Sequence, residues 1–168
     1  MNYSALVSSG SGGVAWAPRA LFGTIYSSTA ASTSTSTYAN APTALGFAVV
    51  SGSTYTFSYD LSVGCSGTGG LRVGLIGPTI KSVRTKAWGN GSATALIVFS
   101  TGSLTTSGGI GSMSTPFNTS NSTTGRVFVA GQIVPSADGF VQLVFSPVTS
   151  GQTATIYEGT TMQVWRRQ

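Results

Sequence analysis

The chain of 168 residues contains no histidine, one cysteine and three carboxylates, which excludes many catalytic and metal sites. Without histidine, neither Ser-His-Asp triads nor zinc sites that use histidine can form. Cys65 has no partner for an internal disulfide, and we expect it to be an inert thiol. A two-carboxylate glycosidase is one alternative, which we disfavour because Asp60 lies in an expected strand and Asp138 in an expected turn. A Ser or Thr nucleophile would need Lys81 or Lys86 as its base, and no motif surrounds either lysine. We therefore expect a protein that is not an enzyme and holds no cofactor and no metal.

Charge is scarce as well, because charged residues are 7% of the chain, against about 25% in average soluble domains. The net charge of +5 arises mainly because acids are few. The cations are too thinly spread to predict specific nucleic-acid binding, and attraction to an acidic surface is the milder alternative. Apolar runs are short and residues 1–13 carry no charge, so we expect neither a membrane span nor a signal peptide.

From about residue 45 onward, apolar and polar residues alternate with period two between clusters of Gly, Ser, Asn and Pro. This pattern is typical of antiparallel strands with one buried face, and no helical periodicity persists. In residues 54–63 one face carries only apolar side chains, which are Tyr55, Phe57, Tyr59, Leu61 and Val63. The sequence predicts about eight strands, at 45–50, 54–63, 71–75, 95–99, 126–133, 141–145, 153–157 and 161–166.

These strands predict an all-β fold, a two-sheet antiparallel β-sandwich with jelly-roll connectivity, because double layering manages many strand edges. We place this domain at residues 45–168. Residues 1–44 include the Ser-, Thr- and Ala-rich run 27–37 and predict an extended N-terminal arm. We expect the arm to dock onto a neighbouring subunit, or alternatively across its own sheet. Residues 102–125 predict a long loop held by contacts.

The arm also contains large apolar side chains outside the strand pattern. Trp16 and Phe22 flank Arg19, and exposed aromatic residues of this kind usually mark an interface. Arg166 and Arg167 follow Trp165 at the end of the last expected strand. We predict that these five residues, Trp16, Arg19, Phe22, Arg166 and Arg167, contact a partner.

A second group, Arg84, Lys86, Trp88 and Asn90, combines an aromatic ring, an amide and two cations in a short stretch. Such groups can stack on and hydrogen-bond a sugar, so this stretch is a candidate contact for a glycan or for an acidic protein surface. The simpler interpretation is that Trp88 closes one end of the sandwich.

Turn glycines and strand aromatics recur in four motifs of this sequence. They are F-x-V-x-x-G-x-x-Y-x-F at 47–57, GGLRVGL-x-GP at 69–78, V-x-G-x-I followed by SADG at 129–139, and ATI-x-x-GT-x-x-QV at 154–164. Together they resemble a β-sandwich domain of virion structural proteins in tailed bacteriophages, where it forms decoration or fibre-associated modules. The resemblance covers about residues 44–168 and implies no catalytic residues.

The resemblance implies a non-enzymatic phage structural protein, for which we expect first a capsid decoration (cement) protein that clamps and stabilises the assembled shell. Its partners would be the major capsid protein or other virion subunits. A homotrimer is expected because decoration subunits often occupy threefold positions. This hypothesis places the chain in the virion, on the capsid surface in preference to the tail. The alternative is a receptor- or glycan-binding module associated with a tail or head fibre.

Overall fold

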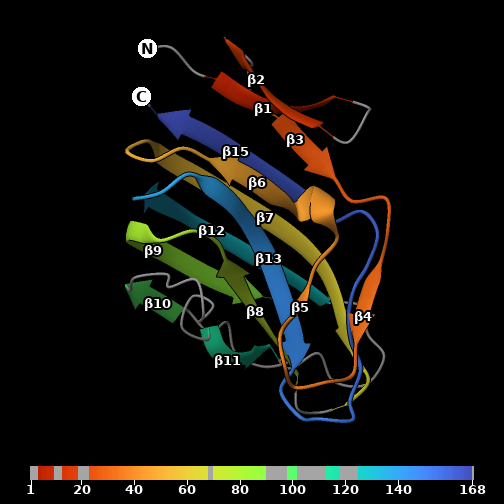
Figure 1. The fold of residues 1–168 in the computed structure, drawn as a ribbon. Coiled ribbons are helices and arrows are strands. Elements are labelled where there is room, and N and C mark those ends of the chain that lie inside the picture. The colour runs from red at the N-terminus through yellow and green to blue at the C-terminus, as the bar shows by residue number, and fades with distance from the viewer. Residues whose placement is uncertain are drawn as a thin grey trace.

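The computed structural model describes residues 4–9, 13–18, 23–67, 70–89, 98–101, 113–117 and 125–167, with side chains within 24–67, 70–89 and 125–166. These residues form strands and one short 3-10 helix, η1 (Thr43–Leu45), and two antiparallel sheets pack face to face (Figure 1). The expected all-β sandwich is therefore confirmed. In the described ranges, no helix is long and apolar enough to cross a membrane.

The larger sheet, sheet A, contains ten strands. Their bounds are β1 Ser4–Ser9, β2 Gly13–Pro18, β3 Gly23–Tyr26, β4 Ala31–Thr33, β7 Thr54–Cys65, β9 Ile80–Gly89, β10 Val98–Thr101, β12 Gly125–Pro135, β14 Ala154–Ile156 and β15 Thr161–Arg167. Seven of them follow the order β10-β9-β12-β7-β15-β1-β2, while β14 pairs with β4 and β7, and β3 pairs with β15.

The smaller sheet, sheet B, contains five strands. Their bounds are β5 Ala39–Asn40, β6 Gly46–Val49, β8 Leu71–Ile76, β11 Met113–Phe117 and β13 Gly139–Pro147. The order is β11-β8-β13-β5, and β6 also pairs with β13. From β6 to β9, successive strands alternate between the two sheets. The jelly-roll assignment stays a prediction.

The core lies between the sheets, where the inward positions of each strand meet. The apolar face predicted for residues 54–63 is confirmed, since all five of its side chains are at most 1% exposed. Leu71, Val73 and Leu75 of β8 and Phe145 of β13 close the core from sheet B. The outward residues of β7 from residue 54 to 62 are half-buried polar side chains.

The segment expected as an arm contributes strands β1 to β5 within its described parts. Thr24 of β3 lies opposite Gln163 of β15, β4 pairs with β14, and β5 pairs with β13. The described strands of this segment therefore pair along the protein's own sheets, and its docking onto a neighbouring subunit stays a prediction. The expected loop 102–125 lies mostly outside the described residues, but β11 within it pairs with β8.

One strand was missed in the sequence. The predicted set contains no strand at residues 80–89, yet β9 pairs with β12 over most of its length and is an inner strand of sheet A. This correction matters for function because Arg84, Lys86 and Trp88 lie on β9.

Candidate functional site

The outer face of sheet A carries a pocket of about 220 Å³ over β7, β9, β12 and β15. Outward side chains of neighbouring strands lie side by side. Phe128 lies opposite both Trp88 and Asp60, and Asp60 lies opposite Thr161. The pairing register therefore places an aromatic pair beside a row of polar groups. The pocket is lined by Ser58, Tyr59, Asp60, Trp88, Phe128, Val129, Thr161 and Gln163.

An aromatic stack forms one side of this pocket. The rings of Trp88 and Phe128 lie nearly parallel, with their centroids 5.6 Å apart and their planes at 16°. The ammonium group of Lys86 lies 5.5 Å from the centroid of the Trp88 ring. Because β9 points Trp88 away from the core, this ring is half-buried on the outer face of the sheet. The part of the ring that remains exposed is an apolar surface of the kind that stacks on ligands.

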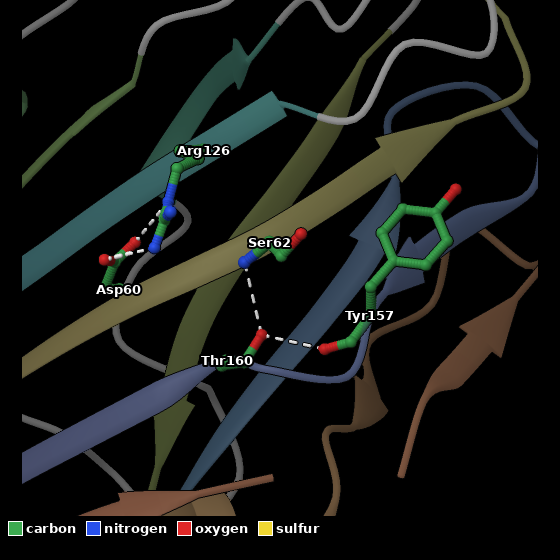
Figure 2. Close-up of polar contacts among 5 residues, drawn as sticks. All are labelled: Asp60, Ser62, Arg126, Tyr157 and Thr160. Atoms are coloured by element: carbon green, nitrogen blue, oxygen red, sulfur yellow. Dashed lines mark hydrogen bonds and ion pairs between the residues drawn. The ribbon is translucent and has the colours of Figure 1, made fainter. Parts of the chain in front are cut away.

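Asp60, which lines the pocket together with Trp88 and Phe128, forms an ion pair with Arg126 (Figure 2). Arg126 of β12 donates from Nε to Oδ1 of Asp60 at 2.9 Å and from Nη2 to Oδ2 at 2.5 Å. This bidentate geometry orients both side chains and pairs the charge of the carboxylate with that of the guanidinium. Further along β7, the backbone N–H of Ser62 donates to Oγ1 of Thr160, which donates to the carbonyl of Tyr157 (Figure 2).

Gln163 supplies an amide at the opposite side of the pocket. Its Nε2 donates to Oγ1 of Thr24 on β3 at 3.1 Å, which orients the amide. Tyr59 lies beneath the pocket, and its ring points into the core, where the hydroxyl donates to the carbonyl of Leu45 at 3.2 Å. Burial raises the pKa of Tyr59, so it stays a neutral hydrogen-bond donor.

A second pocket of about 210 Å³ lies at the C-terminal end of β7. The Tyr157 side chain covers Gly64, where an added Cβ would lie 2.6 Å from the tyrosine hydroxyl oxygen. Cys65 lines this pocket, but it is 3% exposed and its Sγ donates to the carbonyl of Gly70 at 3.4 Å. The buried position agrees with a structural thiol.

Three of the predicted contact residues come together. Arg84, Lys86 and Trp88 alternate along the outward side of β9, and both cations are exposed. Asn90, the fourth member of this group, lies outside the described residues.

The predicted partner interface is only partly visible. Arg166 is half-buried, and its Nε and Nη2 donate to Oγ of Ser53 at 3.0 and 2.8 Å within the same chain. Arg167 belongs to β15 and Trp16 to β2, but their side chains lie outside the described part of the structure. Arg19 and Phe22 lie outside it altogether.

The sequence interpretation missed Phe128, Arg126 and Gln163 as parts of one site. A signal for Phe128 was present, because it occupies the position between inward Val127 and Val129 where the alternation requires a solvent-facing residue. An aromatic residue on the open face of a sheet is a candidate ligand contact. No sequence signal indicated that Phe128 would lie opposite Trp88.

Comparisons with known proteins give no independent assignment of this site. No protein-family model, curated protein or solved structure matches the chain. The resemblance to phage virion domains therefore stays a prediction. Among the side chains that the structure describes, no group of three or more His, Cys, Asp and Glu residues is placed to hold a metal ion.

Proposed function

We propose that this chain is a non-enzymatic binding protein of a phage virion and that the outer face of sheet A binds a carbohydrate. The observation that carries the proposal is the pocket in which the Trp88–Phe128 stack lies beside Asp60 and Gln163. Aromatic rings offer apolar faces to the C–H groups of a sugar, and fixed polar groups hydrogen-bond its hydroxyls. The virion location is supported by the sequence resemblance alone.

Of the two roles that the sequence predicts, the described side chains favour glycan binding over capsid decoration. The decoration role depends on Trp16, Arg19 and Phe22, whose side chains lie outside the described residues. It stays a prediction, as do the capsid location, the contact with the major capsid protein and the trimer. The carbohydrate role depends on side chains whose positions and contacts are described.

A glycan array probed with the wild-type chain and with Trp88→Ala tests the proposal. We expect the wild type to bind a limited set of glycans and Trp88→Ala to bind them about tenfold or more weakly, because the stacking surface is lost. Phe140→Ala is the matched control, since Phe140 is an exposed aromatic residue (38%) on β13 of the other sheet. Circular dichroism and thermal unfolding establish that each variant is folded.

Two results would contradict the proposal. One is the absence of any glycan bound by the wild type. The other is equal binding by the wild type and a folded Trp88→Ala variant, which would place the glycan elsewhere on the molecule. An image of the intact particle that locates the chain on shell or tail tests the virion part separately.

A further inference from the structure

Positive charges outnumber negative charges around the pocket. Asp60 is the carboxylate that lines the pocket, and both of its oxygens accept hydrogen bonds from Arg126. Arg84 and Lys86 project from the same side of β9 as Trp88, at spacings of about 7 Å along the strand, and both are exposed. In the described part of the chain, the only ion pair is that between Arg126 and Asp60, so these two cations have no carboxylate partner.

The register places one small side chain between Lys86 and the pocket lining. Lys86 lies opposite Ala130 of β12, and Ala130 lies opposite Ser58 of β7, which lines the pocket. Ala130 has the smallest side chain that a non-glycine residue can place there. A ligand group above Ala130 would therefore lie between the strand positions of Lys86 and Ser58.

Lys86 also lies over the ring that a sugar would use. Its ammonium is 5.5 Å from the Trp88 centroid, a favourable cation–π arrangement. A neutral sugar that stacks on Trp88 would displace the Lys86 ammonium from the ring and would offer it no opposite charge in return. A sugar with a carboxylate or sulfate gives the ammonium an opposite charge at the same place.

From this geometry we infer that the ligand is an acidic glycan, whose carboxylate or sulfate groups contact Lys86 and Arg84 while a sugar ring stacks on Trp88. The inference rests on the proposed carbohydrate function and adds the charge of the ligand to it. Carboxylates and sulfates share the chemistry that these cations recognise. The alternation of Arg84, Lys86 and Trp88 along β9 suits a polymer with repeated negative charges.

Matched pairs of glycans test the charge of the ligand. The pairs are polygalacturonate and its methyl ester, a sialylated oligosaccharide and its desialylated form, and a sulfated polysaccharide and its desulfated form. We expect at least one acidic member to bind about tenfold or more tightly than its neutral partner at low salt, with a preference that shrinks as salt is added. Equal binding of the two members in every bound pair would overturn the inference.

Matched variants locate the contact. Lys86→Gln is expected to weaken acidic-glycan binding about two- to fivefold, the size of one exposed charge pair, and Lys86→Arg to retain binding. The control is Lys81→Gln, which removes the same charge from an exposed position on the same strand. Arg84→Gln is expected to resemble Lys86→Gln. Equal losses in Lys81→Gln and Lys86→Gln would refute a local contact.

The outcomes separate the two proposals. If neutral glycans bind as tightly as acidic ones and Trp88→Ala abolishes that binding, the carbohydrate function stands and the charge inference fails. If no glycan binds, both fail. If a DNA duplex or an acidic protein binds equally well and Trp88→Ala has no effect, the surface is a general polyanion-binding face, and both are overturned.

Discussion

Arg126 on β12 and Asp60 on β7 form the ion pair that joins the two central strands of sheet A on their outer face, with both carboxylate oxygens bonded to one guanidinium. The side chain of Arg126 is 52% exposed and that of Asp60 is 30% exposed. Solvent therefore screens the pair, and its contribution is mainly to hold the two side chains in place at the pocket.

Asp60→Asn is expected to lower the free energy of unfolding by only about 0.5 kcal/mol, because exposed ion pairs contribute little net stability. Urea unfolding measures the change. A double-mutant cycle with Arg126→Gln isolates the coupling energy of the pair, which we expect to stay below about 1 kcal/mol. A coupling energy above about 2 kcal/mol would show a pair that is shielded from water, in conflict with the observed exposure.

A closer packing constraint lies on the inward side of β12. A Cβ added to Gly131 would meet the carbonyl oxygen of Arg84 and would lie 2.7 Å from Cγ2 of Thr85 and 2.8 Å from the Phe57 ring. We expect Gly131→Ala to lower the free energy of unfolding by about 1–3 kcal/mol, the usual cost of overpacking. Ala130→Ser is the control, since residue 130 is next to Gly131 on β12 but its side chain faces outward. Equal urea midpoints for Gly131→Ala and the wild type would contradict this packing.

The same strands show why the sequence predicted β7 and missed β9. From Tyr55 to Val63, every inward position of β7 is an apolar residue, so the period-two pattern is clear. In β9 the inward positions include Thr85 and Ala87, which are 4% and 0% exposed, and the outward positions include Trp88. The contrast between the two faces is therefore weak. Pairing with β12 along most of β9 overrides this weak local signal, and long-range pairing is not encoded in local periodicity.

Arg72 of β8 contacts residues 36 and 38 of the segment 34–40 and holds this segment against sheet B. Its Nη2 donates to the carbonyl of Ser36 at 2.6 Å and to that of Pro147 at 3.4 Å, while its guanidinium lies 5.5 Å from the centroid of the Tyr38 ring. We expect Arg72→Gln to increase the rate of backbone hydrogen exchange in residues 34–40, since these bonds contribute about 1–2 kcal/mol in total.

Mass spectrometry of peptides from residues 34–40 measures this exchange. Arg72→Lys is the control that keeps the charge and the contact with Tyr38 but loses the planar fork, so it should give an intermediate rate. Unchanged exchange in Arg72→Gln would show that the segment is held by β5 pairing alone.

The candidate site could be predicted only in part, for a related reason. Arg84, Lys86 and Trp88 were found because they are close in sequence and chemically distinctive. Phe128 joins Trp88 because β12 and β9 pair in one register, and a shift by one residue would turn Phe128 into the core. The register depends on contacts spread over both sheets, so the composition of the full pocket emerges only in the folded chain.

The last prediction concerns alkaline pH and the buried hydroxyl of Tyr59. Burial raises the pKa of Tyr59 above its ordinary value of 10.0, so the folded chain keeps a proton that the unfolded chain releases. The stabilising effect is complete below pH 10 and is lost as the pH rises above it, by up to about 1.4 kcal/mol per pH unit. Tyr59→Phe should be less stable at pH 7, by about 1 kcal/mol for the lost bond to Leu45, and should have a shallower decline between pH 10 and 11.

Urea unfolding of the wild type and of Tyr59→Phe at intervals from pH 8 to 11 measures both slopes. Tyr26→Phe is the control, because Tyr26 is 68% exposed and its removal should leave the slope unchanged. Burial also raises the pKa of Tyr38, although Arg72 partly opposes this shift, so some decline will persist in Tyr59→Phe. If the free energy of unfolding falls with pH equally in the wild type and in Tyr59→Phe, Tyr59 ionises equally in the folded and unfolded chains. That result would contradict the burial of its side chain and the hydrogen bond of its hydroxyl to Leu45.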